Sequence, residues 1–424
     1  MSNPARGALL SALVRFSRQV WVRAAVFALA AVVFALVAGV VGQLVPFDLA
    51  IDLGQDSVGS ILQIIATAML TATTFSVTAM VTAYSSAATS ATPRATRLLI
   101  ADPTSQNALA TFLGAFVFAL VGIIALSTGY YGEEGRTILF FGTLIVVAII
   151  VVTLLRWIGH LAGFGRMTDV IDRVEDAASE TISAFAAAPT LGARPYREAP
   201  RDAETVWADE TGYIAHIDLA AIDRAAQRAG AEVYVAAMPG SVADALHPLA
   251  HVVPAEETTD ARDAGSLGDV VRRAFLIEHH RDFDQDPRLG VIALSEIASR
   301  ALSPATNDPG TAIDVIAALQ RVFTLTATTE PSGEVDFPHV HVRAPELRDL
   351  VTDAFRPIAR DGSGIVEVQL RLQKCLAALA AADPENSAVY TAAASDARRR
   401  ARAALDPVDA LTLDDVALDS QPGL

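Results

Sequence analysis

A row of hydroxyl side chains within an apolar segment has the clearest chemical potential in this chain. Residues 57–92 are apolar enough to enter a bilayer, yet hydroxyls recur in them at steps of three and four, which places them on one face of an α-helix. Hydroxyls in a membrane face other helices or water rather than lipid, and they can replace the water around an ion. This row, the hydroxyl stripe, consists of Thr67, Thr71, Thr74, Thr78, Thr82 and Ser85.

The hydroxyl stripe supports two interpretations. In the first, the hydroxyls line a polar conduit. In the second, they allow neighbouring helices to pack closely, which the alanines on the same segment also favour. Both interpretations hold together if helices from several copies of the chain pack closely and enclose the conduit between them. Residues 59–84 contain no acidic or basic side chain, which a proton-coupled pump usually needs and a passive channel does not.

The segment Thr92-Pro93-Arg94, with Arg97 close behind it, follows the stripe at the expected cytoplasmic end of the helix. As a functional site at the mouth of a conduit, it would attract an anion or a lipid headgroup. The alternative is that Arg94 and Arg97 only orient the helix, because cytoplasmic loops carry an excess of basic residues.

A second candidate site is the loop at residues 303–311, which joins two expected helices. It combines hydroxyls, an amide and a helix N-terminus whose free N–H groups suit an anion. The alternative is a tightly capped turn, for which Pro and Asn are typical. The candidate ligand-binding residues, with the carboxylate that begins the preceding helix, are Ser303, Thr306, Asn307, Asp308, Thr311 and Asp286.

The remaining polar residues predict neither a metal site nor a cofactor site. Alternating acids at residues 282–286 resemble the start of an EF-hand loop, but Pro287 and Ala293 stand where that loop needs Gly and Glu. Two pairs of histidines lack a clear third metal ligand. Walker, nucleophile-elbow and zinc-protease motifs are absent from the sequence, so we expect no enzymatic activity.

The composition is that of a membrane protein. Hydrophobic residues make up 52% of the 424 residues, and the mean hydropathy of +0.39 is too high for an ordinary soluble chain. Four segments reach the roughly 20 residues that a helix needs to cross hydrocarbon. They are residues 21–45, 59–84, 107–126 and 137–157.

The loop charges predict how these segments cross the bilayer. Basic residues precede the first segment and follow the second and fourth, whereas the first loop is acidic, so both termini are expected in the cytoplasm of a bacterial inner membrane. We read the first segment as an uncleaved signal anchor. The net charge is −16, with the acidic excess after the last segment, which argues against nucleic acid as a partner. A single cysteine, Cys375, fits a cytosolic location for that part.

We therefore expect a membrane α-helical protein with a C-terminal cytosolic α/β domain that is rich in helices. The expected organisation is a four-helix transmembrane domain at 1–165, a stalk helix and linker at 166–205, the α/β-to-α domain at 206–404 and an acidic tail at 405–424. The stalk is expected to continue the fourth membrane helix, and the tail to be loosely held.

Local patterns predict several elements of the cytosolic domain. Residues 212–217 and 232–238 are strand-like, and the helix between them, at 219–229, should end at Gly230. Helical spacing continues in 287–302, 309–325, 344–359, 364–382 and 386–404. Asp caps a helix and Pro suits its first position, so each Asp-Pro pair should open a helix. These pairs are Asp102-Pro103, Asp286-Pro287 and Asp308-Pro309.

Two segments resemble a known family. They are ATAMLTATTFSVTAMVTAYSSAATSATPRATRLLIADPTSQNALATFLGAFVFAL at 66–120 and QDPRLGVIALSEIASRALSPATNDPGTAIDVIAAL at 285–319, and GYIAHIDL and Pro239-Gly240 between them also fit. The chain is similar in these to the bacterial membrane proteins grouped as domain of unknown function 2254. The resemblance extends from about residue 20 to about residue 380 and implies a four-span membrane part with a cytosolic domain. It implies no substrate or reaction.

The function that these observations favour is a homo-oligomeric ion channel, or channel-like conduit, lined by the second membrane helix. Its expected partners are membrane lipid, further copies of the chain and a small ion or anion. The alternative is a membrane-anchored sensor or scaffold whose cytosolic domain binds a ligand or partner at residues 303–311.

Overall fold

The computed structural model describes residues 20–42, 55–100, 102–201, 203–253 and 261–419. They divide into two compact units. The first comprises the described residues up to Thr89 and within Thr96–Asp169, and the second comprises Ser90–Ala95 and the described residues from Val170 onward.

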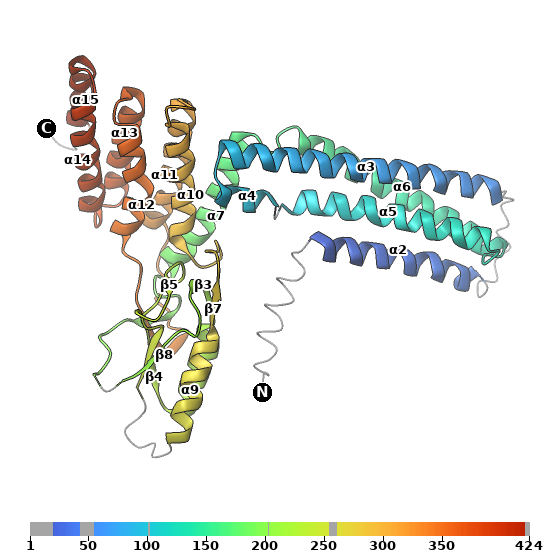
Figure 1. The fold of residues 1–424 in the computed structure, drawn as a ribbon, viewed down its shortest axis with the longest axis horizontal. Helices are drawn as coiled ribbons and strands as arrows, with labels where there is room; N and C mark the ends of the chain where they lie inside the picture. Colours follow the sequence, from blue (N-terminus) through green and yellow to red (C-terminus); the bar gives the residue numbers. More distant parts are fainter. Residues whose placement is uncertain (1–19, 43–54, 101, 202, 254–260, 420–424) are drawn as a thin grey trace. The chain divides into compact units, whose positions relative to one another are not determined.

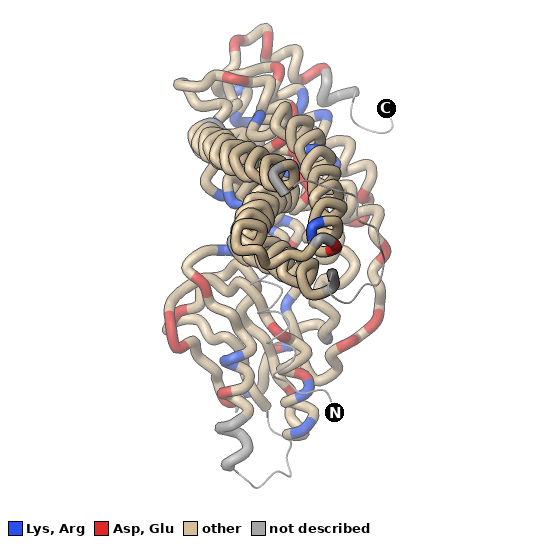
Figure 2. Tube along the Cα trace, turned by 90° about the vertical axis from the view of Figure 1, so that its right-hand side faces the viewer, with Lys and Arg blue, Asp and Glu red and all other residues tan. Residues whose placement is uncertain are grey.

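The first unit is helical (Figure 1). Its elements are α2 (Val20–Gly42), α3 (Gln55–Ser90), α5 (Pro103–Ser127) and α6 (Glu133–Leu161). The short α4 (Pro93–Ile100) begins in the second unit and ends in the first. Figure 2 shows that charged residues are rare along these helices, whereas the second unit carries both signs.

Three of the described helices are long and apolar enough to cross a membrane: Ser57–Thr89, Pro103–Ser127 and Glu134–Leu161. The first segment expected to span falls on α2, whose apolar stretch within the described residues, Ala25–Val40, is shorter. A membrane part with three candidate spanning helices is therefore established, and the expected fourth is not confirmed.

Glycines allow α2 to lie close to its neighbours. A Cβ on Gly114 of α5 would be 3.2 Å from the Cβ of Phe27, and Phe34 leaves no room for one on Gly142 of α6. Beyond the end of α5, the Tyr131 hydroxyl donates to the carbonyl of Ala35 at 2.6 Å. Large apolar side chains on the outer faces of α2, α3 and α6 remain exposed, as expected of helices that contact lipid.

The second unit begins with α7 (Met167–Ala187) and continues into two small sheets. The larger has the order β1-β8-β4-β6-β2 and the smaller the order β5-β3-β7. The pairs β1–β8 and β4–β8 are parallel, and the other pairs are antiparallel. The strands are β1 (Ala193–Pro195), β2 (Glu204–Val206), β3 (Gly212–Ile217), β4 (Glu232–Val235), β5 (Val242–Ala243), β6 (Ala250–Val253), β7 (Phe275–Glu278) and β8 (Phe337–Val342).

Helices α8 (Leu219–Ala229) and α9 (Ala261–Ala274) pack with these strands around a core that includes Ile214, Ile222 and Val233. The predicted strand at 212–217 and helix at 219–229 are confirmed, and Gly230 ends α8 in the left-handed region at φ 61°. However, β3 and β4 belong to different sheets. The strand, helix and strand therefore do not form one βαβ unit.

The rest of the second unit is a stack of helices. They are α10 (Pro287–Ala301), α11 (Pro309–Thr328), α12 (Leu347–Asp361), α13 (Val366–Ala382), α14 (Ser387–Ala404) and α15 (Pro407–Asp419). The five helices predicted between 287 and 404 are all confirmed. Their core includes Phe323, Phe355 and Tyr390. Cys375 is also buried there, and burial raises the pKa of its thiol to about 12.

All three Asp-Pro predictions are confirmed at atomic detail. The carboxylates of Asp102, Asp286 and Asp308 cap α5, α10 and α11 by accepting hydrogen bonds from backbone N–H groups two or three residues later. Satisfying these otherwise unpaired donors is worth about 1 kcal/mol per helix.

Three local expectations are wrong. The fourth membrane helix does not continue as the stalk, because a turn containing Gly165 at φ 78° separates α6 from α7. The linker that was expected between the stalk helix and residue 206 contains β1 and most of β2. The described part of the tail forms α15, as far as residue 419, and an ion pair between Arg402 and Asp414 at 2.7 Å holds it.

Gly290 provides a test of the helix packing in the second unit. A Cβ at this position would lie 2.5 Å from the Cβ and 2.7 Å from the Cα of Ala178 in α7. We expect Gly290→Val to lower the free energy of unfolding by about 2–3 kcal/mol, because the backbones of α7 and α10 must separate. The measurement is the thermal midpoint of the full chain in detergent by near-ultraviolet circular dichroism.

The matched control is Gly364→Val, whose nearest neighbour outside its own segment is 3.8 Å away. It should change the midpoint little. Equal midpoints for the two variants would show that α7 and α10 are not in close contact.

Candidate functional site

The hydroxyl stripe lies on the exposed face of α3. Its six side chains are exposed in the first unit. The buried side chains of the same helix occupy positions about half a turn away from the stripe. They are Val58, Leu62, Ile65, Met69, Ser76, Met80 and Ala87. Within the described part of the chain, the stripe therefore points away from the helices against which α3 packs.

The hydroxyl hydrogens of the threonines in the stripe bond within α3 itself. Each of its five threonines donates to the carbonyl oxygen four residues earlier, at 2.9–3.0 Å. This bonding is common for threonine inside membrane helices. Because the hydrogen points back along the helix, each hydroxyl oxygen presents its lone pairs outward as an acceptor.

The stripe has an apolar border. Exposed side chains on either side of it include Phe75 at 64% and Val81 at 58% of their full accessibility. Between Thr67 and Thr82 the stripe is about 22 Å long, at the 1.5 Å rise of a helix, which is most of the roughly 30 Å thickness of hydrocarbon. The result is a polar strip within an otherwise lipophilic helix face.

The predicted mouth residues begin α4. Thr92 is buried and its hydroxyl accepts the N–H of Ala95 at 3.3 Å, while Pro93 takes the first helical position. Arg94 forms an ion pair with Glu296 of α10, both within the second unit. Arg97 is exposed in the first unit. The two arginines that were predicted to act together therefore belong to different units.

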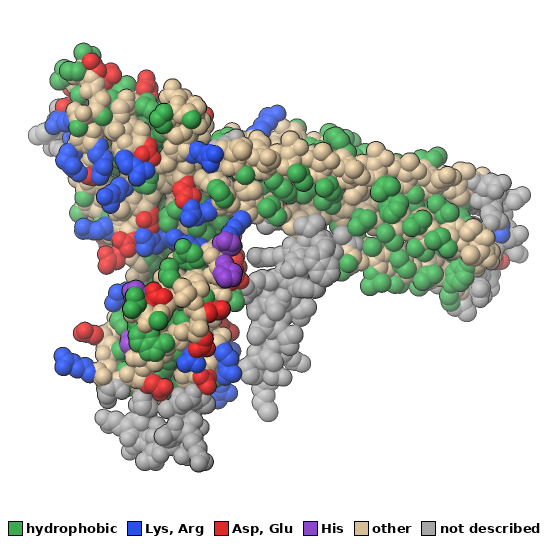
Figure 3. Space-filling view, in the orientation of Figure 1, with side chains coloured by type: hydrophobic (Ala, Val, Ile, Leu, Met, Phe, Trp, Pro, Cys, Tyr) green, Lys and Arg blue, Asp and Glu red, His purple; other side chains and the backbone are tan. Residues whose placement is uncertain are grey.

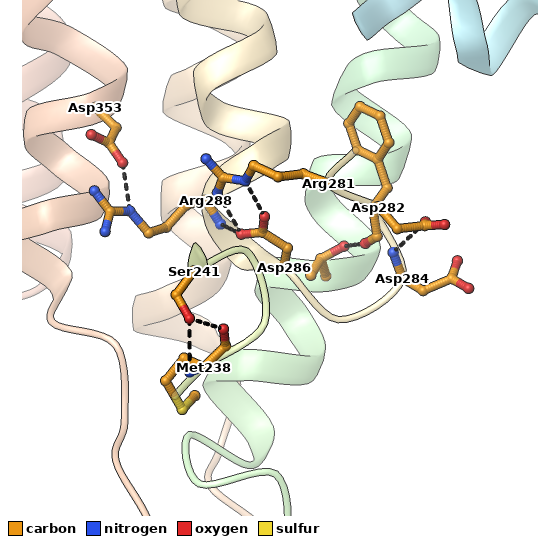
Figure 4. A network of polar contacts seen from close by, with 10 residues as sticks. Met238, Ser241, Arg281, Asp282, Asp284, Asp286, Arg288 and Asp353 are labelled. Atoms are coloured by element: carbon orange, nitrogen blue, oxygen red, sulfur yellow. Dashed lines mark hydrogen bonds and ion pairs between the residues drawn. The ribbon is translucent and has the colours of Figure 1, made fainter. Parts of the chain in front are cut away.

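Asp286 is the centre of a buried polar network in the second unit (Figure 4). Its side chain is 1% exposed and binds Arg281 through two hydrogen bonds, of 2.6 and 2.9 Å. One carboxylate oxygen also accepts the N–H of Arg288 at 3.0 Å. The Arg288 side chain binds Asp353 of α12 at 2.7 Å, and this hydrogen bond raises the pKa of Arg288.

The turn at 238–241 closes over this carboxylate. Gly240 has φ 84°, and a Cβ there would collide with Asp286. Ser241 holds the turn by donating to the carbonyl of Met238 at 2.6 Å, and the N–H of Gly240 donates to Ile214 of β3 at 2.8 Å. The turn at Gly240 and the start of α10 are therefore in direct contact.

The loop at 303–311 is a self-contained turn. Ser303 donates to the carbonyl of Arg300 at 2.7 Å, and Asn307 has a positive φ of 47°. Asp308 accepts both the N–H and the hydroxyl of Thr311, at 3.1 and 2.6 Å, which lowers the pKa of its carboxyl group. Thr306 is exposed and lies within hydrogen-bonding reach of the Ser303 hydroxyl.

Asp286 and this loop are not brought together. They stand at opposite ends of α10, which places them about 25 Å apart at the helical rise. The candidate ligand-binding residues of the sequence thus divide into a buried network at the start of α10 and an exposed turn after it.

Histidines and acids do not gather into a metal site among the described residues. His339 binds Asp223 at 3.1 Å, and His341 stacks on Tyr234 with a ring separation of 4.4 Å. The two histidines of β8 therefore have different partners.

A buried cluster at the ends of α5 and α6 was not predicted. Ser105 donates its hydroxyl hydrogen to Asp102 at 2.5 Å, and His160 lies 3.0 Å from the same carboxylate. Asp102 and Ser105 are 4% and 0% exposed. Because the hydroxyl hydrogen of Ser105 goes to the carboxylate rather than to the imidazole, the arrangement is a helix cap braced by histidine and not a nucleophilic triad. The Asp102-Pro103 pair indicated the cap, but no local signal indicates His160.

These features define an α-helical membrane protein with a second unit that is rich in helices and contains two small sheets. The chain belongs to the family described as "predicted membrane protein", DUF2254, whose pattern matches residues 17–378.

Two curated relatives come from mycobacteria. An uncharacterised protein of Mycobacterium tuberculosis strain H37Rv and one of Mycobacterium bovis are each 24% identical over 276 residues, which is 63% of this chain and 52% of the relative. The chain thus spans about half the length of the curated relatives that it matches. No solved structure matches it.

The Asp286 network yields a stability prediction. We expect Asp286→Ala to reduce the free energy of local opening around α10 by about 3–5 kcal/mol. The reason is that Arg281, whose side chain is only 18% exposed, would lose the buried carboxylate that it binds. Hydrogen exchange of the full chain in detergent, followed on peptides that cover 212–217 and 287–301, measures this change.

Asp349→Ala is the matched control. Asp349 is 54% exposed and lies 3.6 Å from Arg288 at the edge of the same network, so its loss should change the opening free energy by less than about 0.5 kcal/mol. Similar exchange in the two variants would contradict a central role for the buried carboxylate.

Proposed function

We propose that this protein is a homo-oligomeric conduit for small cations in a bacterial inner membrane, with the hydroxyl stripe of α3 facing the axis. The observation that carries the proposal is the outward position of the stripe, opposite the buried face of its own helix. A polar strip on a lipophilic face is favoured only where it meets water or another protein. Further copies of the chain around an axis would supply both the protein beside the stripe and a water-filled space in front of it.

The chemistry of the stripe favours cations. Its hydroxyl oxygens present lone pairs, and oxygen acceptors replace the hydration shell of a cation rather than of an anion. The helix from Ser57 to Thr89 contains no charged side chain that would hold an ion permanently, so weak binding at successive hydroxyls would allow ions to pass. The proposal includes a first spanning helix built on α2 and both termini in the cytoplasm.

The alternative of a membrane-anchored sensor with its ligand at 303–311 has less support. The side chains of Ser303, Asp308 and Thr311 are bonded within the turn itself. The turn therefore resembles a capped connection more than a preformed ligand site.

Cysteine substitution along α3 tests the conduit. The protein is reconstituted in planar bilayers, and cation current is recorded before and after a water-soluble, positively charged thiol reagent. We expect Thr74→Cys to be modified and the current to fall, because the reagent adds bulk and positive charge at the axis. The native Cys375 is buried with its pKa raised to about 12, so the unsubstituted protein should be insensitive.

Ile145→Cys provides the matched control. Ile145 is 62% exposed on α6, a different helix from that of the stripe, and should stay in lipid beyond the reach of the reagent. Absence of current from the unsubstituted protein across cations and voltages, or equal modification of both cysteines, would exclude the conduit.

A further inference from the structure

A cleft in the helical part of the second unit has no part in the sites above. It has a volume of about 560 Å³ and lies between α10, α12 and α14. A neighbouring hollow of about 380 Å³ shares Thr352, Arg356 and Arg400 with it. Figure 3 shows basic side chains gathered over this helical part. Volumes of this size suit a small molecule.

The charges around the cleft are not balanced. Two arginines that line it have acidic partners: Arg360 binds Asp361 at 2.6 Å and Arg400 binds Asp396 at 2.9 Å. The lining acids are also engaged, since Asp353 binds Arg288 and Glu296 binds Arg94. Of the three arginines that line the cleft, Arg356 remains.

Arg356 lines the cleft from α12 and forms no ion pair with any residue that the structure describes. The two acids that line the cleft bind other arginines. Although the chain has a net charge of −16, Arg356 is therefore available to bind a negatively charged group. Its planar guanidinium matches the oxygens of phosphate through paired hydrogen bonds.

A second, independent observation points to a ligand. Ser295 of α10 lines the same cleft and is 1% exposed, and its hydroxyl has no hydrogen-bond partner among the described residues. A buried polar group without a partner is uncommon, because leaving it unbonded costs about 1–3 kcal/mol. A ligand oxygen in the cleft would satisfy it.

We propose that this cleft binds a small phosphate-bearing anion, with Arg356 holding its charge and Ser295 donating a hydrogen bond to a phosphate oxygen. The inference is independent of ion conduction. Soluble phosphate esters and phospholipid headgroups share this chemistry.

The test is isothermal titration of the full chain, in phosphatidylcholine nanodiscs, with inorganic pyrophosphate. We expect saturable binding that Arg356→Ala weakens about tenfold or more, as for the loss of a charge-assisted bond worth at least 1.4 kcal/mol. Ser295→Ala should weaken binding about threefold to tenfold. It should not lower the thermal midpoint without ligand, because it removes an unbonded group, whereas a purely structural serine would lower it.

Arg228→Ala is the matched control for charge. Arg228 is exposed on α8 and does not line the cleft, so its loss should change the affinity less than about twofold, as for a distant screened charge. Competition by dihexanoyl phosphatidylglycerol, below its micellar concentration, distinguishes a phospholipid headgroup from a soluble phosphate ester as the natural ligand. Displacement of pyrophosphate indicates a lipid headgroup, and lack of displacement indicates a soluble phosphate.

Absence of saturable pyrophosphate binding by the unsubstituted protein would overturn the proposal. Unchanged affinity in both Arg356→Ala and Ser295→Ala, or an equal loss in Arg228→Ala, would overturn it as well. Both cleft variants should fold, because Arg356 is exposed and Ser295→Ala removes a single oxygen atom.

Discussion

The second unit depends on one carboxylate that is almost completely removed from water. Asp286 joins three parts of the chain: the segment after β7 through Arg281, the first turn of α10 through its backbone, and the turn at Gly240, which packs against its side chain. A buried charge is tolerated only when all its neighbours compensate it. The sheets and the helical stack therefore share a joint that favours one arrangement over any in which these segments separate.

Much of this fold follows from local rules. Asp102, Asp286 and Asp308 each cap a helix, because the side chain of Asp and the ring of Pro act within two or three residues of each other. Gly230 ends α8 for an equally local reason. The errors arise where the outcome depends on distant partners. Strand β1 consists of three residues and pairs with β8, more than 140 residues later, so its own sequence contains little signal. The placement of β3 and β4 in different sheets is likewise decided by their pairing partners.

The same distinction applies to the candidate sites. The spacing of the threonines was sufficient to place them on one face, but only packing shows that this face is the outer one. The contact between Asp102 and His160 joins residues far apart in sequence, and so does the cleft formed by Ser295, Arg356 and Arg400. Asp102 belongs to an Asp-Pro pair that predicts its cap, but no spaced motif contains His160, Ser295, Arg356 or Arg400. They become informative only when burial and pairing identify a hydroxyl without a partner and a cation without an acid.

The internal bonding of the hydroxyl stripe limits what can contact it. If two copies of α3 met across a symmetry axis with their stripes facing, lone pair would oppose lone pair, because the hydroxyl hydrogen of each threonine in the stripe already binds a carbonyl of its own helix. Identical acceptor rows cannot bond directly to each other. A dry, symmetric contact through this face is therefore disfavoured, and a close one requires a mediator that brings hydrogens or positive charge into the gap, as water and cations do.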